Sequence, residues 1–94
     1  MGGPGLTQTI TKLPATYSQT AIGDEVVVMS LESGAFFSLT GTAQAIWLAL
    51  DQHHQRAAVL AALAQDYASG PAELAADLDE FVAELVAAGL VRTD

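Results

Sequence analysis

The first part of the chain carries short apolar runs broken by turn residues, a pattern that predicts β-strands. The runs TYSQTAI (residues 16–22), VVVMSL (26–31) and AFFSL (35–39) are rich in β-branched and aromatic side chains. The turn sequences GDE and ESG separate them, and Gly34 stands where a three-residue hairpin loop adopts a positive φ. We therefore expect a meander of three antiparallel strands.

From Thr40 onward the apolar period changes from two residues to 3.6, which predicts helices. Either Thr40 or Thr42 can cap the first of them. Its apolar positions recur at spacings of three and four, namely Ala43, Ile46, Trp47 and Leu50. A second helix is expected over residues 56–67, where Tyr67 is its last apolar position.

The third expected helix covers residues 71–88, between Ser69 as a candidate cap and Gly89 as a helix-ending glycine. Its apolar stripe is formed by Leu74, Leu78, Phe81, Val82 and Leu85. Leu90 and Val91 follow the glycine and are expected to pack back on the helices.

Together these elements indicate an α+β fold, in which a three-stranded antiparallel sheet is followed by three helices packed on one of its faces. The outline resembles a winged helix-turn-helix. Residues 1–14 contain three glycines and two prolines, so we expect a flexible N-terminal tail there. Residues 15–94 then form the single predicted domain.

The composition removes several kinds of chemistry. The chain has no cysteine, which rules out disulfides, thiolate metal sites and cysteine nucleophiles. Its two histidines, His53 and His54, are adjacent in an expected loop with no third ligand nearby, so we expect neither a metal site nor catalysis. No apolar run reaches the roughly 20 residues of a membrane span. A reducing cytoplasm is the expected location.

The charge is strongly unbalanced, since eleven carboxylates face three cations and give a net charge of −8. A winged helix-turn-helix suggests DNA binding, which requires basic residues on the helix that enters the groove. Residues 71–88 carry five acids and no lysine or arginine, which argues against a nucleic-acid partner. The charge favours a neutral or basic partner, although solubility alone is a sufficient explanation for it.

The strand at residues 35–39 is expected at an edge of the sheet, because the second strand of a meander is central. An exposed edge offers unpaired N–H and C=O groups to an extended peptide, and AFFSL contains no lysine or proline that would block it. Peptide binding therefore fits the pattern. The alternatives are that the N-terminal tail covers this edge or that a second copy pairs with it.

Phe36 and Phe37 are neighbours in this strand and must point to opposite faces of the sheet. We assign Phe37 to the core face together with Ala35 and Leu39. Phe36 then shares the open face with Ser38, where it covers the sheet or contacts an incoming peptide.

An ordered set of residues between positions 23 and 91 resembles a known family. In the hairpin and first helix the matching residues are Gly34, Phe37, Leu39, Ala45, Ile46, Trp47, Leu48 and Leu50. In the third helix and after it they are Asp77, Leu78, Phe81, Leu85, Gly89 and Leu90. The set resembles the PqqD-type RiPP recognition elements, which bind leader segments of ribosomally made, post-translationally modified peptides. Thr40 stands where that family usually has asparagine, and Ser30 where aspartate is frequent.

The resemblance implies a non-catalytic adaptor without cofactor or metal. Within the family, the short free-standing form is most similar to the leader-binding half of split lasso-peptide B proteins. Such a protein delivers the precursor's leader peptide to a separate leader peptidase, a cysteine protease. The alternatives are a PQQ-pathway peptide chaperone for a radical SAM enzyme and a structural oligomerising module.

The resemblance also implies a binding mode, in which the leader adds as a strand against the third strand and beside the third helix. The strand residues expected to contact it are Ala35, Phe36, Phe37, Ser38 and Leu39. On the helix, the expected groove wall is formed by Leu74, Asp77, Leu78 and Phe81, with Asp77 as a polar partner for a leader tyrosine hydroxyl. Ordinary core packing is the alternative for the two leucines and Phe81.

Overall fold

A computed structural model of the chain describes residues 8–66 and 70–94. Its elements in order are β1 (Ile10–Lys12), a 3-10 turn (Pro14–Thr16), β2 (Tyr17–Ile22), β3 (Glu25–Ser30), β4 (Phe36–Leu39), α1 (Gly41–Ala49), α2 (Arg56–Asp66), α3 (Pro71–Ala87) and β5 (Val91–Thr93). The predicted α+β fold is confirmed, with a three-stranded sheet followed by three helices. The expected roles of Tyr67 and Ser69 lie outside the described residues.

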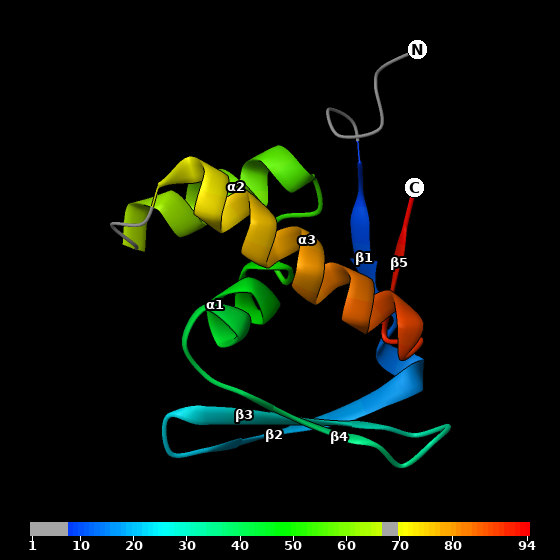
Figure 1. The fold of residues 1–94 in the computed structure, drawn as a ribbon. Helices are drawn as coiled ribbons and strands as arrows, with labels where there is room; N and C mark the ends of the chain where they lie inside the picture. Colours follow the sequence, from blue (N-terminus) through cyan, green and yellow to red (C-terminus); the bar gives the residue numbers. More distant parts are fainter. Residues whose placement is uncertain (1–7, 67–69) are drawn as a thin grey trace.

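The main sheet has the strand order β2-β3-β4, and both pairs are antiparallel. The helices lie on one face of this sheet and leave the other open (Figure 1). The hairpin between β3 and β4 closes as the sequence indicates. Ser30 N–H donates to the Ala35 carbonyl at 2.9 Å, while Gly34 adopts a φ of +76° and donates to the Ser30 carbonyl at 2.8 Å.

The core lies between the helices and the sheet face that carries Val26, Val28 and Ser30, all of which are buried. Trp47 of α1 is its largest fully buried side chain. The indole N–H of Trp47 donates to the Gln19 side-chain oxygen at 2.9 Å, which satisfies the polar atom of the ring. The ring of Tyr17 meets the indole edge-on with 5.0 Å between centroids. Two residues of β2 thereby fix α1 on the sheet.

The N-terminal part of the chain departs from the prediction of a flexible tail over residues 1–14. Residues 10–12 form β1, which pairs antiparallel with β5, and Ile10 is only 1 % exposed within the core. Residues 1–7 lie outside the described residues, but the expectation is wrong for residues 8–14. The segment packs on the rest of the chain because Ile10 and Leu13, which follow the glycines, give it apolar side chains to bury.

Lys12 connects β1 to α1 through its long side chain. Its ammonium lies 3.9 Å from the centre of the Trp47 ring and 2.7 Å from an Asp51 carboxylate oxygen. Burial lowers the pKa of Lys12, although its hydrogen bond to Asp51 and the charge of that carboxylate act in the opposite direction. The side chain is 7 % exposed, so the ammonium is held by the indole face and the Asp51 carboxylate in place of water.

Thr40 and Gly89 stand at the two helix ends that the sequence predicts. Thr40 is the residue that precedes α1, as expected, but its hydroxyl makes no capping hydrogen bond. Gly89 follows α3 with a φ of +77°, which confirms it as the helix-ending glycine. The chain then reverses, and Leu90 and Val91 are buried against the helices as predicted.

An exposed ion pair joins α2 to α3. Arg56 donates two hydrogen bonds of 2.8 Å to the Asp79 carboxylate. These bonds lower the pKa of Asp79, so the pair stabilises the fold above the pKa of an unfolded aspartate. The stabilisation is lost as the pH falls through the lower pKa of the folded state. Because Asp79 is exposed, solvent limits the contribution to about 1 kcal/mol or less.

We expect Asp79→Asn to lower the free energy of unfolding at pH 7 by about 0.2–1 kcal/mol. The difference from the parent protein should shrink as the pH falls below about 4, where the carboxylate of the unfolded chain is protonated. Urea unfolding at several pH values between 3 and 7 measures it, with Asp66→Asn on α2 as the control. A difference that is independent of pH would contradict this role for the pair.

Candidate functional site

The outer edge of β4 carries free backbone groups whose positions follow from the strand register. In an antiparallel pair, residues alternate between those bonded to the partner strand and those facing away from it. The Ser30–Ala35 hydrogen bond and the Val28↔Phe37 and Val26↔Leu39 pairs fix this alternation. The N–H and C=O groups of Phe36 and Ser38 therefore point away from β3. Among residues 8–66 and 70–94, no strand pairs with this edge.

The two faces of β4 separate the adjacent aromatic side chains as the sequence predicted. Phe36 is 71 % exposed on the open face, whereas Phe37 packs against the core beneath the helices. Leu39 is buried on the same face as Phe37. Ser38 lies on the open face, where its hydroxyl donates to the Glu25 carboxylate. The assignment of Ala35 to the core face is wrong, because Ala35 precedes the strand in the β3–β4 hairpin and is exposed.

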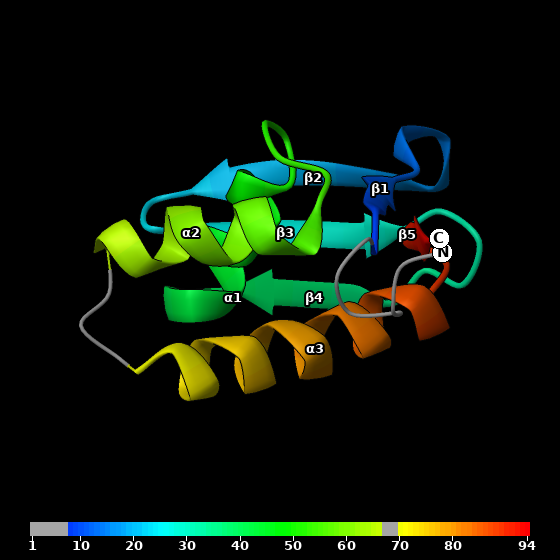
Figure 2. The same cartoon turned by 90° about the horizontal axis from the view of Figure 1, so that it is seen from above.

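A cavity of about 360 Å³ opens where β4 ends and α1 begins. Its walls come from the β4–α1 junction, from α1 and from α3. The lining residues are Thr40, Thr42, Ala43, Ile46, Asp77, Glu80, Phe81 and Glu84. Seen from above in Figure 2, α3 projects just beyond the outer edge of β4, and Figure 1 shows that it lies in the helix layer above the sheet. A peptide strand added to β4 would therefore lie on the sheet side of α3.

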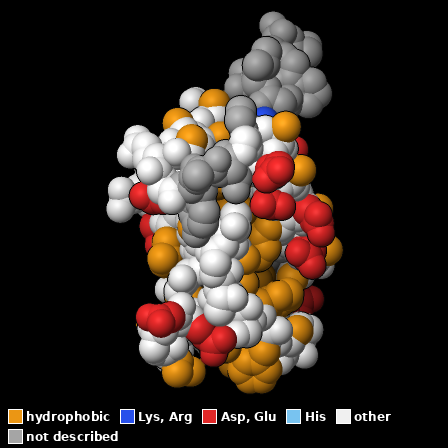
Figure 3. All heavy atoms as spheres, turned by 60° about the vertical axis from the view of Figure 1, so that its left-hand side comes forward, with side chains coloured by type: hydrophobic (Ala, Val, Ile, Leu, Met, Phe, Trp, Pro, Cys, Tyr) orange, Lys and Arg blue, Asp and Glu red, His pale blue; other side chains and the backbone are white. Residues whose placement is uncertain are grey.

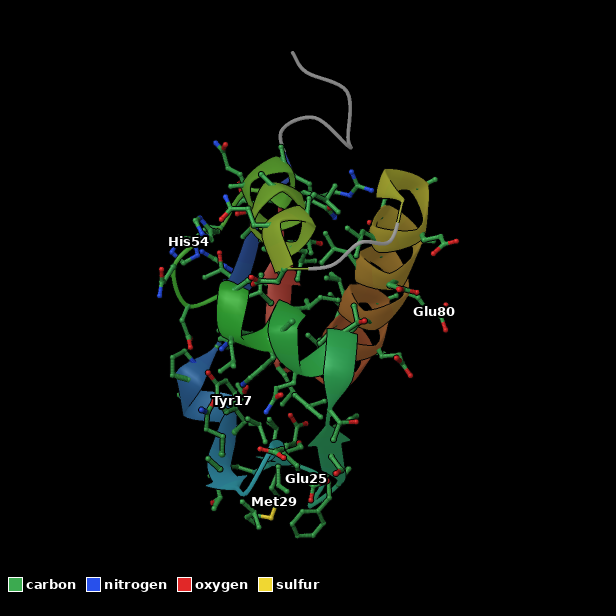
Figure 4. All side chains as sticks on the ribbon, turned by 90° about the vertical axis from the view of Figure 1, so that its left-hand side faces the viewer. Tyr17, Glu25, Met29, His54 and Glu80 are labelled. Atoms are coloured by element: carbon green, nitrogen blue, oxygen red, sulfur yellow. The ribbon has the colours of Figure 1, made fainter. Side chains whose placement is uncertain are left out.

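The cavity combines apolar and acidic surface. Ala43, Ile46 and Phe81 contribute apolar surface, while Asp77, Glu80 and Glu84 are exposed carboxylates at spacings of three and four along α3. Figure 3 shows acidic side chains bordering hydrophobic surface on this side of the molecule, and Figure 4 shows Glu80 projecting from α3.

None of the chain's three cations neutralises these carboxylates within the described structure. Lys12 pairs with Asp51, Arg56 pairs with Asp79, and Arg92 lies on β5. The negative charge at the cavity is therefore available to a ligand. An anionic ligand would be repelled, whereas a neutral hydroxyl or a cation would be attracted.

The structure brings some of the predicted site residues together and leaves others in the core. Asp77 and Phe81 line the cavity, and Phe36 and Ser38 present the free edge. Leu74 and Leu78 are 2 % and 0 % exposed, and neither lines the cavity.

Sequence reasoning did not identify six of the lining residues as part of the site: Thr40, Thr42, Ala43, Ile46, Glu80 and Glu84. The two glutamates could have been found, because they share one side of the helix with Asp77. Nothing in the sequence indicates that the two threonines line a cavity, since their place depends on how the helices pack.

The described residues contain no group of three or more His, Asp or Glu side chains that could hold a metal ion. None of the helices within those residues is both long enough and apolar enough to cross a membrane.

Comparison with known proteins gives two matches. The family model "Coenzyme PQQ synthesis protein D (PqqD)" matches residues 25–91. No curated protein matches the chain. A solved structure described as TbiB1 in complex with the TbiA(beta) leader peptide is similar, with a TM-score of 0.78 and 24 % sequence identity. The similarity covers 87 % of this chain and 95 % of that one, and it supports the fold described above.

Proposed function

The chain belongs to the PqqD family, and from this premise we propose that it is a RiPP recognition element that binds the leader of a precursor peptide. The observation that carries the proposal is the outer edge of β4, which is unpaired within the described residues and lies beside the cavity between α1 and α3. The structurally similar protein TbiB1 was solved with a leader peptide, which supports the same class of ligand here.

In the proposed binding mode, the leader adds as a strand to β4. Its backbone pairs with the outward N–H and C=O groups of Phe36 and Ser38, which supplies affinity with little demand on sequence. Every second leader side chain then points toward the helices. Side chains near the end of β4 enter the cavity, where Phe81 offers apolar contact and Asp77 can accept a hydrogen bond. Leu74 and Leu78 serve the core rather than the groove.

Titration of a fluorescent leader segment, taken from a precursor encoded beside the protein, tests this function. We expect a saturable increase in fluorescence anisotropy with one leader bound per chain. A peptide of the same composition in scrambled order is the control, because charge alone would bind both peptides equally. Equal binding of the two peptides, or binding of neither, would overturn the proposed function.

Asp77→Ala tests the cavity. Asp77 is exposed, so its loss should change the free energy of unfolding by no more than about 0.5 kcal/mol. Loss of one hydrogen bond to the leader should weaken its binding by about 2- to 12-fold, which corresponds to about 0.5–1.5 kcal/mol. Anisotropy titration measures the affinity.

The matched control for Asp77→Ala is Asp66→Ala, which removes the same charge from α2 outside this cavity. Equal leader affinities in the two variants would place the leader elsewhere. Phe81→Ala is less informative, because Phe81 is buried and its loss is expected to cost about 3–5 kcal/mol of stability.

Two pathways are consistent with such an adaptor. We propose delivery of a lasso-peptide leader to a separate leader peptidase, on the basis of the sequence resemblance to split lasso-peptide B proteins. The name of the matching family model favours the second candidate, a peptide chaperone for a radical SAM enzyme in PQQ synthesis. Titrating the protein with the leaders of both precursor classes, and with the leader peptidase and the radical SAM enzyme, distinguishes the two pathways. The leader and the enzyme that bind identify the pathway.

A further inference from the structure

The central strand β3 has more apolar surface than the helices cover. Its residues Val26, Val27, Val28 and Met29 form a continuous apolar run, which is typical of strands buried on both faces. An antiparallel sheet with one solvated face normally alternates apolar and polar residues instead. Here Val26 and Val28 are buried beneath the helices, while Val27 and Met29 are half-buried on the open face.

The apolar surface of the open face extends from β3 onto β4. Met29 lies directly opposite Phe36, in a non-hydrogen-bonded pair where side chains approach most closely. We refer to Val27, Met29 and Phe36 as the open-face patch. Figure 4 shows Met29 on the side of the sheet away from the helices. Within the described chain, the helices all lie on the opposite face, so they leave the patch to solvent.

We propose that the open-face patch is the docking surface for the enzyme that acts on the leader, and that this enzyme meets it with an apolar surface bordered by lysine or arginine. The proposal rests on the proposed function, since the enzyme is defined by its action on the bound leader.

The charges around the patch determine the chemistry of its partner. Glu25 lies on the open face, Asp24 lies in the β2–β3 turn, and Glu32 lies in the β3–β4 turn, so acids stand at both ends of the patch. None of the three cations of the chain lies on these strands. A second copy would bring acids against acids and a net charge of −8 against −8. A partner with a basic margin has complementary charge and a faster association.

The position of the patch connects it to the leader. Phe36 belongs to the patch through its side chain and to the free edge of β4 through its backbone. An added leader strand would extend the same sheet, and its outward side chains would continue the open face. An enzyme bound to the patch is therefore adjacent to the leader, and it contacts the protein and the leader on one continuous surface.

Met29→Glu tests the proposal, because Met29 is on the central strand and leaves the β4 edge intact. With the purified leader peptidase of the same pathway as the probe, we expect its affinity for the protein–leader complex to fall at least about tenfold. Leader affinity should stay within about twofold, since no edge group is changed. Ala61→Glu, at an exposed position of α2, is the matched charge control, and circular dichroism verifies the fold of each variant.

Met29→Gln keeps the size without adding charge and provides a second variant if the glutamate disturbs the sheet. Glu32→Lys should slow association with the peptidase and weaken its dependence on salt. Equal peptidase binding by the Met29 and Ala61 variants would overturn the proposal. So would a dimer of the unaltered protein that Met29→Glu converts to a monomer. If the leader fails to bind, the proposed leader function is wrong. Binding of the peptidase to the leader-free protein, weakened by Met29→Glu, would still support the patch as its docking surface.

Discussion

A chain shortened to begin at Ala15 is expected to be unfolded, or to melt at least about 15 °C below the full chain. The deletion removes Ile10 from the core and the whole of β1, which leaves β5 without its partner. It also removes the Ile10 N–H bond to the His54 carbonyl and the Leu13 N–H bond to the Leu90 carbonyl. Since the stability of a small domain is only about 5–15 kcal/mol, these losses approach the whole of it.

Single substitutions at Ile10 grade the effect of the deletion. Ile10→Val should cost about 0.5–1.5 kcal/mol and Ile10→Ala about 2–5 kcal/mol. Thermal unfolding, monitored by circular dichroism, should give melting temperatures that decrease from Ile10→Val to Ile10→Ala to the shortened chain. A shortened chain that melts at the temperature of the full chain would show that residues 8–14 contribute nothing to the fold.

Ser38→Pro is expected to weaken leader binding by about 10- to 100-fold, corresponding to roughly 1–3 kcal/mol for an unmet backbone hydrogen bond. Proline removes the outward N–H of residue 38, so the carbonyl of the added leader strand has no donor there. The pairing of β4 with β3 should survive, because that N–H is not part of the ladder between them. Anisotropy titration with the labelled leader measures the loss.

Two further substitutions separate the backbone effect from side-chain effects. Ser38→Ala removes the same hydroxyl contact to Glu25 but keeps the N–H, so its leader affinity should be close to that of the parent. Phe37→Pro removes a donor that faces β3 and should destabilise the sheet itself. If Ser38→Pro remains folded and binds the leader as well as Ser38→Ala does, the leader does not add to this edge.

The main sheet and the helices could be predicted because each has a strong local signal. The strand from 26 to 31 is a dense β-branched run, and the helix from 71 to 88 has a regular apolar stripe that ends at Gly89. The structure places these elements at Glu25–Ser30 and Pro71–Ala87, within a residue of the prediction. The opposite orientations of Phe36 and Phe37 also follow from alternation alone.

The terminal sheet could not be predicted, because each of its strands is three residues long and they are about 80 positions apart. A short apolar segment after glycines gives no local sign of a distant partner. The cavity was missed in part for a similar reason. The stripe on α3 shows which residues are apolar, but only packing against α1 shows that Leu78 is central while Phe81 reaches the cavity.

The pairing of β1 with β5 brings the two ends of the described chain together. Thr9 and Asp94 exchange backbone hydrogen bonds of 3.3 and 3.0 Å. β1 runs toward the main sheet and β5 runs away from it, so both ends lie on the side of the strands that is remote from this sheet (Figure 1). A second protein domain joined before β1 or after β5 would be attached at the same point of the surface. Either order of fusion would leave the β4 edge and the open face of the sheet free. The geometry therefore permits the same domain to work as a separate subunit or to be fused to another domain at either of its ends.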